Sequence, residues 1–259
     1  MRISVSTVAL KTWWPDPHEA ATLPEKTGAD ALEPVLEGSL QPTRINTEPL
    51  TDIPTPTVHA PFSDVNPATP NDRHAEQVLQ QIEEAARIAN ELEAQHLTVH
   101  PGHLTPVTLN DREKALQLAA ERLNQAADLA ERHDVHLTVE NMPHHPHLLA
   151  TTPDEIKTLT REAHIGYTLD VGHALTSPTP LPEFLDPRPD VLHIHDNHGD
   201  KDEHLPPLEA TLTPEDLRLV LSTRAHPVVE VKGIQQARRA VRTVRRHGDD
   251  EARYGGHHG

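Results

Sequence analysis

Short apolar, β-branched runs recur along the whole chain and predict β-strands that are buried on both faces. Each run is bounded by polar or proline-rich segments. The predicted strands are residues 3–6, 29–35, 57–60, 97–100, 136–140, 165–170, 191–195 and 228–231. Their number and their regular spacing indicate one repeating architecture.

Segments with helical spacing lie between several of these runs and predict crossover helices. The apolar positions of the two clearest segments are Val78, Ile82, Ala85, Ala86, Ala89 and Leu92, and then Leu116, Ala119, Leu123, Ala126 and Ala130. Three helix starts are predicted from a capping residue followed three positions later by an acid. These pairs are Asn110 with Glu113, Thr152 with Glu155, and Thr213 with Asp216.

Strands that alternate with helices form either an open doubly wound sheet or a closed barrel. Eight repeats without a glycine-rich phosphate loop after the first run favour an eight-fold (β/α) barrel. Residues 39–50 and 181–184 show little helical periodicity, so we expect loops there, and a basic last helix is predicted over 238–247. The organisation expected is one barrel domain over residues 1–252 and a flexible tail over 253–259.

Composition narrows the function. With no cysteine, any metal must be held by histidines and carboxylates. A net charge of −17 and 2% aromatic residues argue against DNA as a partner and resemble adaptation to a high-salt cytoplasm. No signal-peptide pattern and no apolar run of membrane-spanning length is present, so a cytoplasmic enzyme that does not contact membranes is expected.

Ionisable residues repeatedly stand at or near the ends of the predicted strands, where parallel barrel strands are normally apolar. They are His59, His100, Glu140, Asp170 with His173 just beyond it, His193 and Glu230. In a closed barrel these positions converge on the carboxyl-terminal face, where barrel enzymes place their chemistry. Several buried carboxylates need a compensating cation. The pattern therefore predicts a divalent metal held by Glu140, Asp170, His193 and Glu230.

Structural explanations compete with this interpretation. The chain has 21 histidines, so any single one is weak evidence. The histidines expected to be structural or at the surface are His144, His145, His147, His257 and His258. Glu140 and Glu230 each follow a valine run, where an unpaired carboxylate would be destabilising. A salt bridge from Glu230 to Lys232 would be the structural alternative.

These residues resemble the xylose-isomerase-like barrel superfamily, which unites sugar isomerases and epimerases with apurinic endonucleases of the endonuclease-four type. The matching stretches run in the family's order over nearly the whole chain. They are Val58-His59-Ala60-Pro61-Phe62, Val99-His100-Pro101-Gly102, Val139-Glu140-Asn141, Leu169-Asp170-Val171-Gly172-His173, His193-Ile194-His195-Asp196-Asn197, Asp202-Glu203-His204-Leu205-Pro206 and Val229-Glu230-Val231-Lys232-Gly233.

The resemblance implies that Glu140, Asp170, His193 and Glu230 form the metal site of the epimerase relatives. In the endonuclease type the matching positions His59, His100, His173, Asp202 and His204 also bind metal, so that three zinc ions are held. One ion rarely takes more than about six ligands, so the additional residues either bind further ions or contact substrate. Manganese and zinc are the ions expected, and cobalt or magnesium would also suit the ligands.

Two departures bear on the reaction. Endonucleases of this type usually read His-Leu-Asn-Asp-Ser-Lys after the seventh strand, whereas His193-Ile194-His195-Asp196-Asn197-His198 is closer to the sugar branch. That branch commonly continues with Gly-Glu-Gly after His-Leu-Pro, but here the stretch is Pro207-Leu208-Glu209-Ala210. The lost glycines put the usual loop conformation, and with it any particular substrate, in question.

The leading hypothesis is an isomerase or epimerase of a small sugar or sugar phosphate that works through an enediolate. Glu140 and Glu230 would form the acid/base pair, and His59, His100 and His173 would orient hydroxyls. Trp13 would pack against the sugar, although hydrophobic cover over the barrel mouth also explains it. The alternatives are a multi-zinc phosphodiesterase of the apurinic-endonuclease type and a sugar or inosose dehydratase. The sequence does not fix the oligomeric state.

Overall fold

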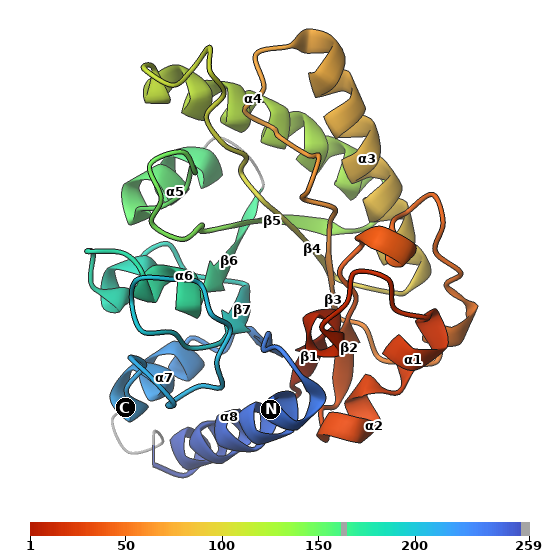
Figure 1. The fold of residues 1–259 in the computed structure, drawn as a ribbon, viewed down its shortest axis with the longest axis vertical. Coiled ribbons are helices and arrows are strands. Elements are labelled where there is room, and N and C mark those ends of the chain that lie inside the picture. The colour runs from red at the N-terminus through yellow and green to blue at the C-terminus, as the bar shows by residue number, and fades with distance from the viewer. Residues whose placement is uncertain (162–164, 255–259) are drawn as a thin grey trace.

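Eight parallel strands form a nearly closed barrel with helices around its outside (Figure 1) in the computed structural model, which describes residues 1–161 and 165–254. The strands are short, and they coincide with the eight apolar runs. They are β1 (Ser4–Ser6), β2 (Ala31–Glu33), β3 (Thr57–His59), β4 (His96–Val99), β5 (His136–Glu140), β6 (Gly166–Asp170), β7 (Val191–Ile194) and β8 (His226–Val229). The predicted fold class is confirmed.

The strand order is β2-β1-β8-β7-β6-β5-β4-β3, and every pairing is parallel. Closure between β2 and β3 rests on a single bridge from Val35 to His59. The His59 amide donates to the Pro34 carbonyl at 3.0 Å, and the Leu36 amide donates to the His59 carbonyl at 2.9 Å. Pro34 has no amide hydrogen, which helps to explain why β2 ends at Glu33.

The helices differ greatly in length. The α-helices are α1 (Pro17–Ala21), α2 (Leu23–Thr27), α3 (Asp72–Glu91), α4 (Arg112–Glu131), α5 (Pro153–Thr160), α6 (Val171–Leu175), α7 (Pro214–Ser222) and α8 (Ile234–Tyr254). Four 3₁₀ turns are η1 (Thr7–Leu10), η2 (Gly38–Leu40), η3 (Glu48–Leu50) and η4 (Leu181–Leu185). The segments expected as loops after β2 and β6 hold only 3₁₀ turns and the five-residue α6.

Helix starts follow local side-chain chemistry. Thr152 and Thr213 cap α5 and α7 as predicted, and Thr213 forms a complete capping box with Asp216. The predicted cap at Asn110 is wrong, because the side chain of Asp111 accepts from the Lys114 amide at 3.0 Å instead. The last helix begins at Ile234, earlier than expected. Most of the predicted tail, residues 255–259, lies outside the described residues.

The barrel contains a small layer of buried hydroxyl groups. Thr98, Thr138 and Thr168, on β4, β5 and β6, are fully buried and share hydrogen bonds of 2.7 Å between Thr138 and Thr168 and 3.0 Å between Thr98 and Thr168. Pairing the hydroxyls with one another satisfies groups that would otherwise be costly to bury. This layer lies one pleat below the strand ends that carry the ionisable residues.

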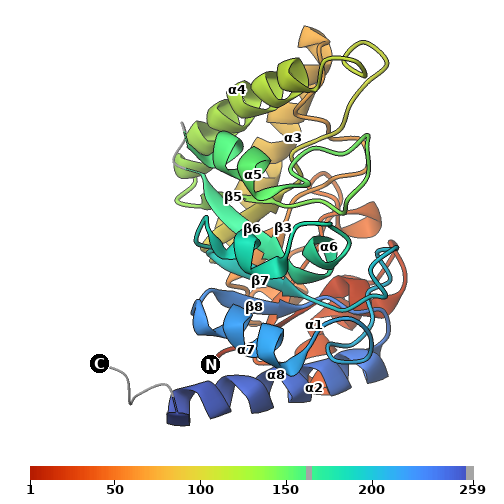
Figure 2. The same ribbon diagram turned by 90° about the vertical axis from the view of Figure 1, so that its left-hand side faces the viewer.

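Long loops extend from the carboxyl ends of the strands, and Figure 2 shows them on the side that carries α6, opposite the N-terminus. We call this face the barrel mouth. His100 and Glu230 each stand one residue beyond their strand, whereas the prediction placed them inside it. Such a difference leaves their place at the mouth unchanged. No helix in the described part of the chain is long and apolar enough to cross a membrane.

Candidate metal centre

The barrel mouth gathers carboxylates and histidines from seven of the eight strands or the loops after them. The carboxylates are Glu33, Glu140, Asp170, Asp202 and Glu230, and the histidines are His59, His100, His173, His193, His195 and His204. Most of these side chains are buried. The structure thus brings together all nine metal-ligand candidates expected from the sequence.

The central group comprises Glu140, Asp170, His193 and Glu230, and we call it the central site. Each residue offers one ligand atom, and these atoms lie within 4.8 Å of one another. Nδ1 of His193 is 3.0 Å from Oε1 of Glu140 and 3.0 Å from Oε2 of Glu230. Opposite ligands of one transition-metal ion are separated by about 4.4 Å, because each bond is about 2.0–2.2 Å long. The central site therefore has the dimensions of a divalent-metal site.

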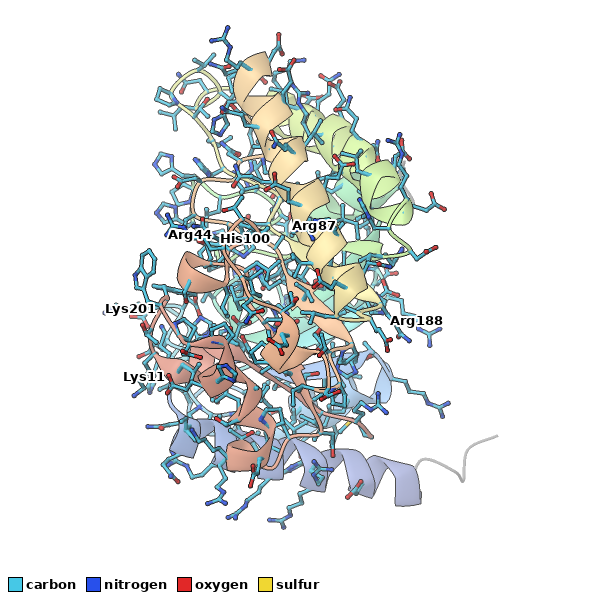
Figure 3. The ribbon with its side chains drawn as sticks, turned by 90° about the vertical axis from the view of Figure 1, so that its right-hand side faces the viewer. Lys11, Arg44, Arg87, His100, Arg188 and Lys201 are labelled. Atoms are coloured by element: carbon cyan, nitrogen blue, oxygen red, sulfur yellow. The ribbon has the colours of Figure 1, made fainter. Side chains whose placement is uncertain are left out.

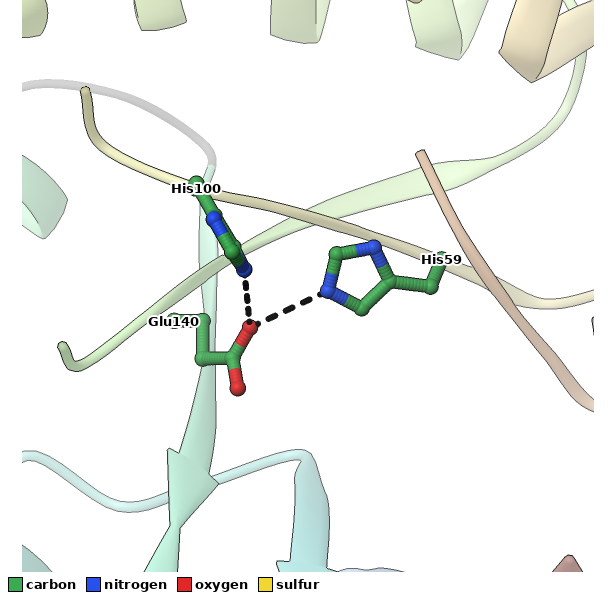
Figure 4. A group of neighbouring side chains, drawn as sticks. All are labelled: His59, His100 and Glu140. Atoms are coloured by element: carbon green, nitrogen blue, oxygen red, sulfur yellow. Dashed lines mark hydrogen bonds and ion pairs between the residues drawn. The ribbon is translucent and has the colours of Figure 1, made fainter. Parts of the chain in front are cut away.

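Glu140 also belongs to a second group. Its Oε2 lies 3.2 Å from Nε2 of His59 and 3.1 Å from Nε2 of His100 (Figure 4). Its Oε1 faces His193 of the central site. One carboxylate thus faces two ligand sets with its two oxygens. This is the arrangement of a carboxylate that bridges two ions, and it is equally an arrangement that orients a single ligand.

A third group lies beside the central site, on α6 and on the loop after β7. Nε2 of His204 is 3.0 Å from Oδ2 of Asp202, and Nε2 of His173 is 3.5 Å from the same oxygen. Oδ1 of Asp202 is buried without a hydrogen-bond partner among the described residues. A buried carboxylate oxygen without a partner fits a place for a cation.

Electrostatics at the central site favour a cation. Burial alone would raise the pKa of Glu140, but its histidine neighbours, His193 foremost, hold it well below its usual value. Burial would likewise raise the pKa of Glu230, and His193 brings it down to about 2. Burial opposes protonation of His193, yet Glu33, Glu230 and Glu140 raise its pKa well above the usual range. The carboxylates thus draw positive charge to this point, and a divalent ion would supply it in place of the proton.

Glu33 is a site residue that the sequence reasoning missed. It is fully buried at the end of β2, and its Oε1 lies 3.3 Å from Nε2 of His193. The other ring nitrogen of His193, Nδ1, faces Glu140 and Glu230, so Glu33 contacts the ring on the side away from those two carboxylates. Metal-binding histidines are commonly oriented by a carboxylate in this way. A carboxylate inside a predicted buried strand was the signal that could have identified it.

His195 is the second missed residue. Its Nε2 lies 3.0 Å from Oδ1 of Asp170, and its ring stacks on His204 at 4.1 Å. A Cβ at position 172 would lie 1.9 Å from the His195 ring, so only glycine fits there. Gly172 therefore lets His195 reach Asp170 and connect the central site to the third group.

The loop after β7 keeps an ordered conformation without the expected glycines. Asp196 accepts backbone hydrogen bonds from Asn197, Ala210, Thr211 and Leu212 at 2.8–3.0 Å, which ties the two ends of the loop together. Leu208 takes a left-handed φ of 70°, a conformation that favours glycine. The sequence change at this loop is therefore accommodated with local backbone strain.

The remaining predicted residues lie at the edge of the site. Trp13 is half exposed and meets the edge of Phe62, whose ring stacks on His100 at 5.0 Å. Within the described residues Lys232 forms no ion pair with Glu230, so the structural alternative for that carboxylate is not seen. Of the three histidines expected to orient hydroxyls, His100 is the one with an appreciable exposed fraction, 22%.

Comparisons with known proteins agree with this fold. The sequence profile of a family described as xylose isomerase-like TIM barrel matches residues 49–246. An uncharacterized protein, MJ1311 of Methanocaldococcus jannaschii, is 33% identical over 157 residues, which cover 57% of this chain and 53% of that protein. The chain spans 53–59% of the length of the curated relatives it matches.

Solved structures extend the similarity to the whole barrel. A D-tagatose 3-epimerase-like protein is similar with a TM-score of 0.82 and 25% identity, covering 97% of this chain and 100% of that one. Endonuclease IV from Thermus thermophilus is similar in fold, with a TM-score of 0.73 and 18% identity, covering 96% of this chain and 100% of that one. The barrel is thus shared by both branches, and the reaction depends on the residues at the mouth.

Proposed function

Because the chain belongs to the xylose isomerase-like TIM barrel family, we propose that it is a metal-dependent isomerase or epimerase of a small polyhydroxy carbonyl compound, a sugar or sugar phosphate. The observation that carries the proposal is the pair of buried carboxylates, Glu140 and Glu230, which face one nitrogen of His193 from β5 and from the residue after β8. The likeness to the D-tagatose 3-epimerase-like protein supports it.

The residues of the central site suit proton transfer at the carbon next to a carbonyl. A divalent ion held by Glu140, Asp170, His193 and Glu230 would polarise the carbonyl and hydroxyl oxygens of the substrate and so acidify that carbon. Glu140 and Glu230 are ionised at neutral pH, the form in which a carboxylate accepts a proton. In epimerisation one glutamate would remove the proton and keep it, while the other, first protonated from solvent, would deliver its own proton to the opposite face of the same carbon. In isomerisation the glutamate that removed the proton would deliver it to the neighbouring carbon.

Two neighbours orient Glu140 and the substrate beside it. His59 is buried against Glu140 and fixes the rotation of its carboxylate, so that Oε1 stays directed to the central site. His100, partly exposed and next to the same carboxylate, is placed to form a hydrogen bond with a substrate hydroxyl. Phe62 stacks on His100 and covers one face of its ring.

A second candidate function is a multi-metal phosphodiesterase. The observation that favours it is the presence of two further ligand groups beside the central site, His59 and His100 with Glu140, and His173 with Asp202 and His204. Adjacent ions clamp a phosphate and activate water. The net charge of −17 and the scarcity of aromatic residues speak against DNA as its substrate.

Metal content and turnover together separate the two functions. Elemental analysis of the purified protein is expected to find one tightly bound ion per chain, exchangeable for Mn²⁺, and chelation should abolish activity while leaving the barrel folded. Turnover should be found among ketoses, their phosphates or inosose-type cyclitols, and not with abasic DNA. About three tightly held zinc ions per chain together with cleavage of a phosphodiester would instead establish the second candidate.

A further inference from the structure

A pocket of about 320 Å³ opens at the barrel mouth between the loop after β1 and the loop after β8. It lies outside the metal-ligand groups described above. Its lining residues are Val8, Lys11, Thr12, Trp13 and Lys232. Two cationic side chains and an indole ring thus border one small space.

Lysine is scarce in this acidic chain, which makes this pairing informative. The protein has only six lysines, and three of them, Lys11, Lys201 and Lys232, stand on loops at the barrel mouth. Figure 3 shows Lys11 and Lys201 on the same side of the molecule as His100. Among the described residues, neither Lys11 nor Lys232 has a carboxylate within ion-pair distance. Both charges are therefore available to a ligand.

The backbone holds Lys11 at this position. Lys11 has a left-handed φ of 59°, and its amide donates to the Val8 carbonyl at 3.0 Å, closing the turn η1. Its Nζ lies 3.1 Å from the point that a Cβ on Gly233 would occupy, so the absence of a side chain at Gly233 makes room for the lysine. Gly233 directly precedes α8, whose N-terminal end adds a partial positive charge beside the pocket.

The pocket adjoins the candidate metal centre on two sides. Lys232 is two residues beyond Glu230, and its amide faces the His204 carbonyl at 3.4 Å. Trp13 meets the edge of Phe62, which in turn stacks on His100. A small molecule with one end at the central site would thus extend past Glu230 and Trp13 to the lysines.

We propose that Lys11 and Lys232 bind the phosphate group of a phosphorylated polyhydroxy substrate whose reacting end lies at the central site. This inference rests on the proposed function and narrows its substrate to a phosphate monoester. The two ammonium groups match the charge of a phosphate, which would otherwise be repelled by the acidic protein. The Trp13 ring supplies an apolar face for the carbon chain of the sugar.

Inorganic phosphate tests the pocket without requiring turnover. Calorimetric titration of the Mn²⁺-loaded protein at fixed ionic strength should show phosphate binding that weakens roughly fivefold in Lys11→Gln and in Lys232→Gln, and further in the double variant. The matched control Lys201→Gln removes a lysine from the same face but not from the pocket, and its phosphate affinity should equal that of the wild type at equal metal content. Unchanged affinity in the double variant, or an equal loss in Lys201→Gln, would overturn the proposal.

A kinetic comparison separates this inference from the proposed function. In the double variant the KM for a phosphorylated substrate should rise, whereas the KM for its unphosphorylated analogue and kcat for both should stay near their wild-type values. Equal changes in KM for the two substrates would refute the phosphate site even though the enzyme is an isomerase or epimerase. If no sugar is turned over but the lysine variants still bind phosphate more weakly than the wild type, the phosphate site is supported and the proposed function is refuted.

Discussion

Buried histidines lie at both ends of the barrel, and the pKa values of two at the mouth and two at the opposite end shift in opposite directions. At the mouth, carboxylates overcome the effect of burial and raise the pKa of His173 and His193 well above the usual value. At the opposite end, burial dominates and lowers the pKa of His96, and it lowers that of His226 to about 4. The carboxylates thus favour positive charge at His173 and His193, although burial lowers the pKa of His100 at the same end, whereas burial favours the neutral form of His96 and His226.

The same strand can place one ionisable residue at the mouth and another at the opposite end of the barrel. β4 begins with His96 and is followed by His100, and β5 begins with His136 and ends with Glu140. Since the direction of a parallel strand decides which end of the barrel a residue reaches, position along the strand separates histidines that composition cannot distinguish. A histidine in this barrel therefore acquires its role from the carboxylates near it.

The largest expected effect is on turnover, and two variants at opposite ends of β5 test it. Glu140→Gln removes a charged ligand and an acid/base group, so turnover should fall by at least about 10³-fold. His136→Gln, at the other end of the same strand, should leave turnover within about twofold. Steady-state kinetics at equal metal content measures both. Wild-type rates in Glu140→Gln would mean that the chemistry lies elsewhere.

A smaller effect should appear at the end of the barrel opposite the mouth as the pH falls. Burial lowers the pKa of His226 to about 4, with a further contribution from His96. Below the pKa of about 6.5 in the unfolded chain, the unfolded state binds a proton that the folded state does not, so stability is present above pH 6.5 and is lost toward pH 4. The shift corresponds to at most about 3 kcal/mol.

Urea unfolding between pH 7 and pH 4 measures whether the free energy of unfolding falls with pH as expected. His226→Gln should keep a side-chain partner for Ser4, whose Oγ lies 2.8 Å from Nε2 of His226. Its acid sensitivity should be weaker than that of the wild type, while His144→Gln, in an exposed loop, should behave like the wild type. Equal acid sensitivity in His226→Gln and the wild type would show that His226 is not the group responsible.

The fold was predictable because parallel barrel strands are buried on both faces and therefore appear as continuous apolar runs. The strand-end residues of the mouth were visible for the same reason, since Glu140 and Asp170 interrupt apolar patterns. Glu33 was not predicted as a site residue because the predicted strand extended to Val35, which placed the glutamate inside the apolar run instead of at its end. Pro34 ends the ladder two residues earlier.

Contacts between distant loops were not predictable. His195 acquires its place from packing on Gly172, 23 positions away, and nothing in the local pattern of either residue indicates that contact. The pocket with Lys11 and Lys232 depends likewise on two loops at opposite ends of the chain that meet only when the barrel closes. Sequence periodicity places residues on strands, but it does not report which loops meet.

The smallest expected effect concerns Glu33, which influences both ends of the barrel because it raises the pKa of His193 at the mouth and of His226 at the other end. Glu33→Gln keeps the shape of the side chain but removes its charge, so Mn²⁺ affinity should fall by about 10- to 100-fold although no expected ligand is lost. Competition with a fluorescent chelator measures that affinity. Histidine NMR titrations should show the pKa of both rings lowered in the metal-free variant. Glu25→Gln, which removes an exposed charge from α2, should change neither quantity. If it weakens Mn²⁺ binding as much as Glu33→Gln, the overall negative charge, and not the contact with His193, governs the metal centre.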